Sequence, residues 1–293
     1  MSVPGLITLA TDLVSATMKP LLHSLAAVAF AGASEEIIRQ FAALDRSTAW
    51  NLVEKIEFEG PTWEPEGIVR LGADRYFVSA GECLHLQGGD LEYHNGGLDY
   101  DGTYLWATLS EYRPNSTATL VRLRPSTLEP EPILRVRDHQ GGIVHDLSTG
   151  ELTTLNWGSR RASQWSLRYP VEPVPDFTTP LATTRNPSGW IDYQDCKFLG
   201  RSKALDSRAV MACGGIADIG GGDGQQAKVT IGGIALVDVL TMTPLIQVPI
   251  PMVTEQGAHM AKNPFDLALV DGKLRLYFLP DEEHSTLYVY EAR

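Results

Sequence analysis

The sequence predicts an all-β fold, a five-bladed β-propeller with six blades as the alternative, and a short helix before the first blade. Almost every segment after residue 44 is a short apolar run bounded by glycine, proline or an aspartate turn, which is typical of β-strands. No long segment has helical periodicity, and strands do not alternate with helices. A degenerate phrase also recurs at spacings close to the length of a four-stranded blade. These three observations together favour a propeller.

The N-terminal 33 residues are predicted to lie outside this domain. An apolar run from Leu21 to Ala33 ends on small residues, as in a secretory signal, and is too short to span a bilayer. We therefore expect residues 1–33 to be an extension with a secretory signal and residues 34–293 to form a single β-propeller domain. The protein is expected in the secretory pathway or outside the cell, and Asn115 begins a glycosylation triplet. The alternative for the apolar run is a buried N-terminal helix.

A helix is expected around Glu35 to Leu44, and strands follow it. The early strands are expected at Ile68–Leu71, Tyr76–Ala80, Tyr104–Leu109, Thr119–Leu123 and Ile133–Val136. The late strands are expected at Ile231–Val239, Leu267–Val270, Leu274–Leu279 and Leu287–Tyr290. The run from Asn51 to Phe58 is expected to join the last blade and so close the ring, because closure removes exposed sheet edges.

Five copies of the recurring phrase mark the expected blade starts. The copies begin at Pro65, His94, His139, Pro187 and Asn263. Gly97 and Gly142 are 45 residues apart, and Gly142 and Gly189 are 47 apart, close to the roughly 40 to 50 residues of a blade. Shorter and longer intervals elsewhere predict one trimmed blade and one with an insertion at Ile216 to Gln226. Glycine suits these positions because the innermost strands converge on the axis.

Charge and cysteine content exclude some classes of function. The formal net charge of −12 repels phosphate backbones, so nucleic-acid binding is not expected. The three cysteines, Cys83, Cys196 and Cys213, have no zinc-site spacing. Cys196 and Cys213 lie on adjacent strand-like runs, so they form either a cross-strand disulfide, in an oxidising compartment, or two buried thiols. The sequence leaves both alternatives open.

Polar residues beside the blade-start glycines are expected to face a shared axial pocket. They are Glu66, His94, His139, His145, Asp192, Gln194, Asp195, His259 and Asn263. Histidine titrates near neutral pH and suits general acid or base catalysis. The alternative is that these histidines bridge blades through hydrogen bonds. No ligand motif predicts a metal ion, and an axial calcium or zinc ion is the alternative to a site without cofactor.

A second group of residues suits a flat, oxygenated ligand. It consists of Trp106, Tyr112, Arg113, Trp157 and Arg160. Aromatic walls stack on flat rings, and guanidinium groups donate charge-assisted hydrogen bonds to oxygen atoms. Structural salt bridges between blades use the same residue types. A small organic molecule is therefore the expected partner, with no stable membrane anchor and no prediction of oligomeric state.

The phrases from His94 to Gly102, Glu111 to Ser116, Asn156 to Arg161 and Asp192 to Cys196 resemble a family of uncharacterised secreted propeller-like proteins of fungi and bacteria. The chain as a whole is also similar to the fungal hetero-Diels-Alderases of tropolone sesquiterpenoid biosynthesis. That resemblance implies a cofactor-free pericyclase of secondary metabolism.

The implied reaction removes water from a hydroxymethyl tropolone or phenol and joins the resulting quinone methide to a humulene-type sesquiterpene. His94 or His139 would then be the acid, and Arg160 or Gln194 would bind the oxygens. Glu66, Trp106, Tyr112, His145, Trp157, Asp192, His259 and Asn263 would bind the substrates. Two alternatives stay open: a metal-dependent hydrolase or lactonase at the axis, and a secreted propeller that binds a ligand without catalysis.

Overall fold

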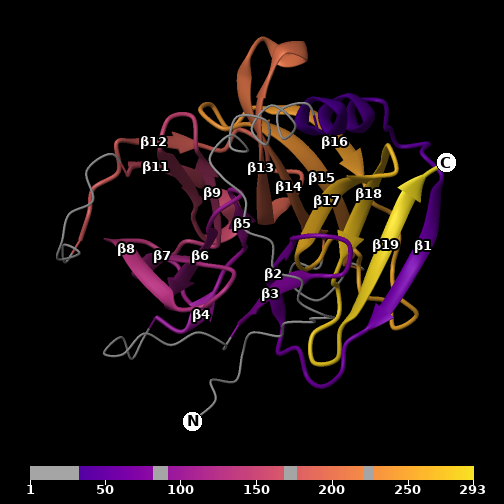
Figure 1. The fold of residues 1–293 in the computed structure, drawn as a ribbon, viewed down its shortest axis with the longest axis horizontal. Helices are drawn as coiled ribbons and strands as arrows, with labels where there is room; N and C mark the ends of the chain where they lie inside the picture. Colours follow the sequence, from indigo (N-terminus) through magenta and orange to yellow (C-terminus); the bar gives the residue numbers. More distant parts are fainter. Residues whose placement is uncertain (1–32, 82–91, 168–176, 221–227) are drawn as a thin grey trace, which may run out of the picture.

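A computed structural model describes residues 33–81, 92–167, 177–220 and 228–293. These residues form antiparallel sheets around a central axis, together with an α-helix at residues 33–42 (Figure 1). The predicted all-β fold with a short N-terminal helix is therefore confirmed. The expected secretory signal and Cys83 lie outside the described residues. In the part of the chain that the structure describes, no helix has the length and apolar character needed to cross a membrane.

The strands belong to five sheets. The first sheet contains β2 (Pro65–Arg70) and β3 (Tyr76–Ala80). The second contains β4 (His94–Asn95), β5 (Asp99–Tyr100), β6 (Leu105–Ser110), β7 (Ala118–Leu123) and β8 (Pro130–Val136). The third contains β9 (Gly142–Asp146), β10 (Glu151–Leu155), β11 (Arg161–Ser166) and β12 (Ala182–Arg185). The fourth contains β13 (Asp192–Ser202), β14 (Arg208–Ile219), β15 (Val229–Asp238) and β16 (Pro244–Pro249). The fifth contains β17 (Phe265–Val270), β18 (Lys273–Phe278), β19 (Thr286–Ala292) and β1 (Trp50–Glu57).

Four of these sheets have the four or more strands of a propeller blade. The predicted count of five blades is not confirmed, because the first sheet has two strands in the described residues and the segment after β3, residues 82–91, lies outside them. The inner strands β2, β5, β9, β13 and β17 contact one another in that order around the ring, and β17 returns to β2. Each inner strand begins at or just after a predicted blade start.

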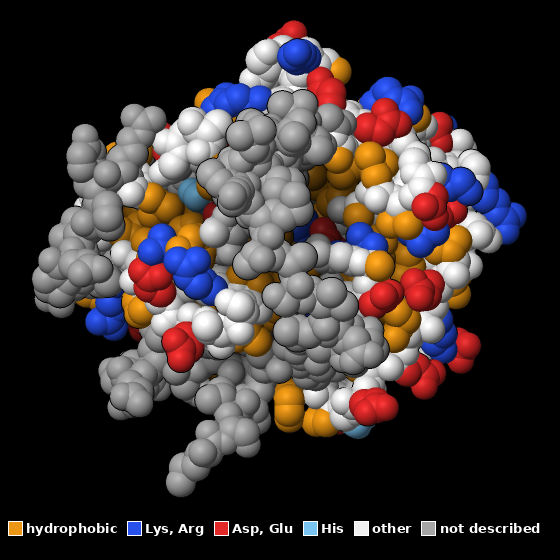
Figure 2. Space-filling view, in the orientation of Figure 1, with side chains coloured by type: hydrophobic (Ala, Val, Ile, Leu, Met, Phe, Trp, Pro, Cys, Tyr) orange, Lys and Arg blue, Asp and Glu red, His pale blue; other side chains and the backbone are white. Residues whose placement is uncertain are grey.

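The ring closes as the sequence predicts. β1 pairs with β19 from Trp50 opposite Ala292 to Glu57 opposite Thr286, so the first and last strands among the described residues share one sheet. Acidic and basic side chains lie interspersed over the face of the molecule seen in Figure 2. An ion pair also links two strands of the fifth sheet, Arg275 of β18 with Glu291 of β19.

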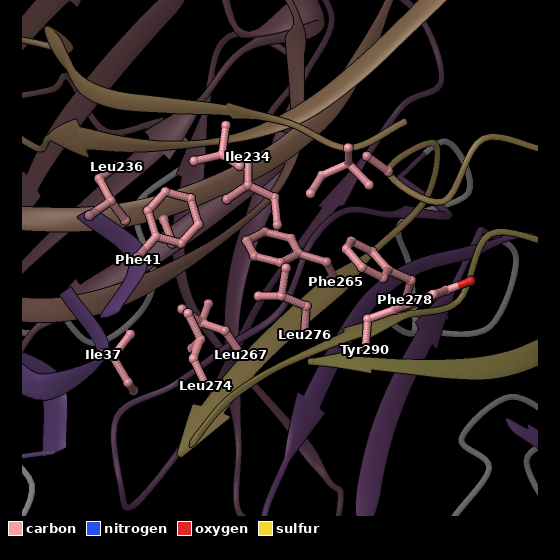
Figure 3. Close-up of a cluster of buried hydrophobic side chains, with 14 of the residues drawn as sticks. Ile37, Phe41, Ile234, Leu236, Phe265, Leu267, Leu274, Leu276, Phe278 and Tyr290 are labelled. Atoms are coloured by element: carbon pink, nitrogen blue, oxygen red, sulfur yellow. The ribbon is translucent and has the colours of Figure 1, made fainter. Parts of the chain in front are cut away.

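The N-terminal helix packs on the fifth sheet through an apolar stripe. Ile37, Ile38 and Phe41 follow the three- and four-residue spacing of a helix face, and all three are buried. They join Phe265, Leu274 and other side chains of the fourth and fifth sheets in one core cluster (Figure 3). Gln40 holds the helix in register, because its amide donates to Gly272 O (2.8 Å) and accepts from Leu274 N (2.7 Å).

The fourth sheet carries the predicted insertion as a hairpin extension. β14 and β15 stay paired as far as Ile219 opposite Val229. On the other side of β14, Cys196 of β13 stands directly opposite Cys213, and the two form a disulfide. This resolves the two alternatives that the sequence leaves open for these cysteines.

Removing this disulfide should lower stability. The double variant with Cys196→Ala and Cys213→Ala is expected to lose about 3 kcal/mol of unfolding free energy, because a cross-link over a loop of this length restricts the unfolded chain. Urea unfolding of the variant and of the oxidised wild type measures the difference. Equal midpoints for the two proteins would contradict the disulfide, and the reduced wild type should match the variant.

Buried aspartates fasten the inner strands to one another. Asp195 of β13 accepts hydrogen bonds from Leu98 N (3.1 Å) and Ile68 N (3.4 Å), which belong to other sheets. Asp99 accepts from His145 N and Asp266 accepts from Arg70 N in the same manner. Gly97 is required here, since a Cβ at this position would lie 2.5 Å from the Asp195 carboxylate. The expected role of glycine at the crowded axis is thus confirmed at this blade start.

Lys197 is the cation at the centre of this group. Its Nζ lies 2.6 Å from Asp195 Oδ2 and also donates to Leu98 O. Burial raises the pKa of Asp195 to about 7 and that of Asp99 to about 6, and the Lys197 charge opposes both shifts. Burial raises the pKa of Asp266 as well. Lys197 is therefore the main positive charge that offsets the cost of burying the carboxyl groups of Asp99, Asp195 and Asp266.

Candidate functional site

A pocket of about 270 Å³ opens at the end of the axis where the inner strands begin. Each of the five sheets contributes a lining residue at or near its blade start. In the order of the sheets, these residues are Glu66, His94, Gly141, Asp192 and Asn263, the last of them just before β17. The sequence predicts this convergence from the recurring phrase alone. The pocket lies slightly below the roughly 300–1,000 Å³ of typical small-molecule sites, so it suits one small ring compound.

β-Bulges place two of the pocket side chains. The register of β2 against β3 shifts between Pro65 and Gly67, so Glu66 is the extra, unpaired residue of that strand. The register of β13 against β14 shifts in the same way around Gln194. A bulge turns one side chain away from the regular alternation and often lies next to an active site. Both residues line the pocket for this reason.

Glu66 and His94 form a close pair in the pocket wall. Glu66 Oε1 lies 3.8 Å from His94 Nε2, and the two side chains are 16% and 10% exposed. This distance is too long for a hydrogen bond. Neither side chain makes a hydrogen bond to another described residue. Both groups are therefore free to act on a ligand in the pocket.

The environment moves the two pKa values in opposite directions. Burial raises the pKa of Glu66 well above its usual value, and the charges of Glu64, Asp195 and Glu282 add to this effect while Lys262 opposes it. Burial, together with a smaller effect of His139, lowers the pKa of His94 to about 4. Between a pH of about 4 and the raised pKa of Glu66, the pair is thus a protonated carboxyl and a neutral imidazole, not an ion pair.

This arrangement changes the role expected for His94. A neutral imidazole accepts a proton rather than donating one, so the carboxyl of Glu66 is the member of this pair that can donate a proton. Pairs of titratable groups whose surroundings separate their pKa values are typical of acid–base catalysis. The sequence places Glu66 in the pocket but does not identify it as the acid, because the shift arises first from burial, which only the fold produces, and then from the charges of Glu64, Asp195 and Glu282.

Aromatic rings form one wall of the pocket. The Tyr112 ring lies 4.4 Å from the His94 ring and 5.3 Å from the Trp157 ring, measured between centroids. His139 contacts Trp157 edge-on at 4.8 Å. Its Nδ1 donates to Glu111 O (3.0 Å), so Nε2 is left as an acceptor, and burial lowers its pKa. Tyr112 and Trp157 are 55% and 37% exposed, which leaves their faces open to a ligand.

Arg160 and Asp192 lie at the edge of this wall. Arg160 Nη2 donates to Asp192 Oδ1, and Arg160 Nε donates to Gly158 O (2.5 Å). Asp192 lines the pocket, whereas Arg160 is not one of the lining residues. Arg113 pairs instead with Glu111, 2.6 Å between Nη2 and Oε2. Arg160 therefore orients Asp192, and its predicted contact with a substrate oxygen stays a prediction.

Three predicted ligand-binding residues do not line this pocket. Trp106 and His145 are buried between the second and third sheets, where both donate to the Asp101 carboxylate at 2.7 Å. His259 packs over Gly232 in the segment before β17. Asp195 also lies outside the pocket, in the buried group around Lys197. His145 therefore fits the alternative in which a histidine bridges blades through hydrogen bonds.

Several pocket residues are missed by the sequence reasoning. They are Glu64, Asn156, Tyr193, Ile216 and Lys262. Each is a near neighbour in the chain of a predicted residue or of the predicted insertion, so a wider window around each blade start would have included them. Among the described residues, no group of three or more His, Cys, Asp or Glu side chains is arranged to hold a metal ion.

The fold resembles several solved structures. They include a GH43 endo-arabinanase from Bacillus licheniformis (11% identity, TM-score 0.43, 80% of this chain and 96% of the other) and a mannose phosphorylase from Leishmania mexicana (12%, 0.38, 67% and 67%). A third is the WD40 propeller domain of Doa1 (10%, 0.33, 79% and 66%). All three TM-scores lie below 0.5, so none of these proteins indicates what this chain binds or catalyses.

The sequence comparisons concern the family alone. A search of curated proteins found no match. Nothing in these matches supports the expected resemblance to hetero-Diels-Alderases, which stays a prediction. The model of a family of unknown function, DUF6454, matches residues 80–293, well over half of the chain. The chain therefore belongs to the DUF6454 family.

Proposed function

We propose that this protein is an acid–base enzyme that acts on one small, oxygenated ring compound in the axial pocket. The observation that carries the proposal is the pair of Glu66 and His94, 3.8 Å apart, with the carboxyl protonated and the imidazole neutral at the same pH. A site that holds both a proton donor and a proton acceptor moves two protons in one reaction. The aromatic wall supplies the surface on which a ring stacks.

The reaction that we propose is loss of water from a hydroxymethyl phenol or hydroxymethyl tropolone. Glu66 donates its proton to the leaving hydroxyl, and the carbon–oxygen bond breaks. His94 accepts the proton of the ring hydroxyl, and the electron pair of that O–H bond completes the quinone methide. The products are the quinone methide and water. Transfer of one proton from His94 back to Glu66 restores the starting state.

Asn263 supports an oxygenated substrate. It is 92% buried, lines the pocket, and its Nδ2 has no hydrogen-bond partner among the described residues. A buried donor without a partner is costly, and a substrate oxygen would satisfy it. We expect Asn263→Ala to raise KM by up to about tenfold, the value of one hydrogen bond, with little change in kcat. Steady-state kinetics measures this, and a loss confined to kcat would contradict the binding role.

The finer proposal is a hetero-Diels-Alderase. The quinone methide would then react with a humulene-type sesquiterpene. The pocket fits one ring compound, so the terpene would bind over the exposed faces of Tyr112 and Trp157 at its mouth. Holding both reactants in a reactive orientation accelerates a bimolecular step without a cofactor. We also propose that the protein is secreted, and the disulfide of Cys196 and Cys213 supports an oxidising compartment.

Oxygen exchange tests the proposed reaction directly. The probe is 2-(hydroxymethyl)phenol with an ¹⁸O-labelled hydroxymethyl group, incubated with the protein in unlabelled water. Reversible formation of the quinone methide replaces the label, and we expect the protein to accelerate this loss above the rate in buffer. A folded protein that leaves the buffer rate unchanged would overturn the proposal, as would activity that a strong chelator abolishes. Added humulene tests the finer step, because an adduct should form at the expense of exchange.

A further inference from the structure

Two consecutive residues just before β2 have an unusual backbone conformation. Trp63 and Glu64 have φ angles of 45° and 53°, the left-handed region that residues with a side chain rarely adopt. Gly81 N donates to both carbonyls, Trp63 O at 3.1 Å and Glu64 O at 2.9 Å, and Glu64 N donates to Glu282 O at 3.0 Å. These contacts come from the residue after β3 and from the segment between β18 and β19. The strained turn is therefore held from both sides, as is common at functional sites.

The turn places a charged group beside the acid. Glu64 lines the same pocket as Glu66, two residues later in the chain. Glu64 Oε2 and His94 Nδ1 both lie close to Gly81. A Cβ built on Gly81 would be 3.7 Å from Glu64 Oε2 and 3.5 Å from His94 Nδ1. No Lys, Arg or His of the described residues lies within ion-pair distance of Glu64. Its charge is therefore not cancelled by a close partner.

The other charged groups around Glu66 are already paired. Asp195 is bonded to Lys197, and Glu282 is bonded to Lys262. His94 is neutral at the pH where the site is proposed to work. Glu64 is the remaining charge that faces the acid from the described residues. Replacing it would change the field at Glu66 without removing a hydrogen bond of Glu66.

We propose that Glu64 is a positioning residue for the acid: the left-handed turn holds its carboxylate in the pocket wall, where its negative charge favours the protonated form of Glu66. This inference rests on the proposed function, and it adds the group that sets the state of the acid. The direction agrees with the pKa of Glu66, for which Glu64 is the largest charge effect after burial.

Titration of Glu66 in the protein without substrate tests the inference. With ¹³C-labelled glutamate carboxyls, NMR follows the ionisation of Glu66, assigned by its absence in Glu66→Gln. We expect Glu64→Gln to shift the midpoint of Glu66 to lower pH, and Glu64→Lys to shift it further. Glu59→Gln removes an equal charge from an exposed site outside the pocket and should leave the midpoint unchanged.

A backbone control separates charge from conformation. Glu64→Asn removes the charge but tolerates the left-handed turn, so it should give the same shift as Glu64→Gln and should fold if that variant does not. Equal midpoints in wild type, Glu64→Gln and Glu64→Asn would overturn the inference. That result would leave the proposed reaction standing, because ¹⁸O exchange is measured separately. Failure of exchange with the expected NMR shifts would reject the reaction and retain the role of Glu64.

Discussion

Replacing Glu66 with glutamine is expected to lower the rate of ¹⁸O exchange by about 10²- to 10⁴-fold, the range for loss of a positioned general acid. Glutamine keeps the shape of the side chain but has no acidic proton to give to the leaving hydroxyl. The bulge that places Glu66 is formed by the backbone, so the fold should be retained. Exchange rates of the variant and of the wild type, measured at one pH, give the effect directly.

The matched control for this experiment is again Glu59→Gln, which makes the same chemical change at an exposed position. It should exchange at the wild-type rate. If Glu66→Gln is fully active and His94→Gln is inactive, the acid is His94, as the sequence alone suggests, and our assignment of the two roles is wrong. Loss of activity in both variants agrees with a donor and an acceptor that act together.

The pH dependence of the wild type follows from the same pair. Below a pH of about 4, His94 is protonated and cannot accept the ring proton, so the rate falls. Above the raised pKa of Glu66, the carboxyl has lost its proton, so the rate falls again. We expect a broad maximum between these limits in a plot of kcat/KM against pH, with the alkaline limb absent in Glu66→Gln. A rate that increases steadily with pH would contradict Glu66 as the acid.

Replacing Lys197 with methionine is expected to give the largest loss of stability, about 3–5 kcal/mol of unfolding free energy near pH 8. The change removes the cation that contacts Asp195 and opposes the raised pKa values of Asp99 and Asp266. Three buried carboxyls are then left without a compensating charge. They must either stay ionised in a poorly solvating interior or take up protons at a pH where the unfolded chain does not.

The sign of the pH effect makes this prediction specific. An aspartate with a raised folded pKa binds its proton more tightly in the folded state, so stability is full at low pH and falls as pH rises toward the folded pKa. The destabilisation by Lys197→Met should therefore be much smaller at pH 5 than at pH 8. Urea unfolding at the two values measures it. Adding Asp195→Asn should recover part of the loss, and an equal loss at both pH values would contradict the account.

Local patterns of the sequence determine much of the ring. The blade-start phrases predict the beginnings of the inner strands, and the run from Asn51 to Phe58 predicts the closing strand β1. Glu66, His94, His139, Asp192 and Asn263 follow from the same phrases, because every inner strand begins at one end of the axis. These features depend on strand alternation and turn residues, which are properties of neighbours in the chain.

Only the tertiary structure decides what those residues can do. Trp106 and His145 resemble the pocket residues in sequence, yet both lie between sheets because the Asp101 carboxylate binds them there. Glu66 gains its raised pKa through burial and through the charges of Glu64, Asp195 and Glu282. The effect of Glu64 on Glu66 and that of Lys197 on the buried aspartates likewise depend on the positions that the fold gives these charges. The sequence by itself determines which polar groups reach the axis, whereas proton affinity depends on solvent exclusion and on charges that folding brings together.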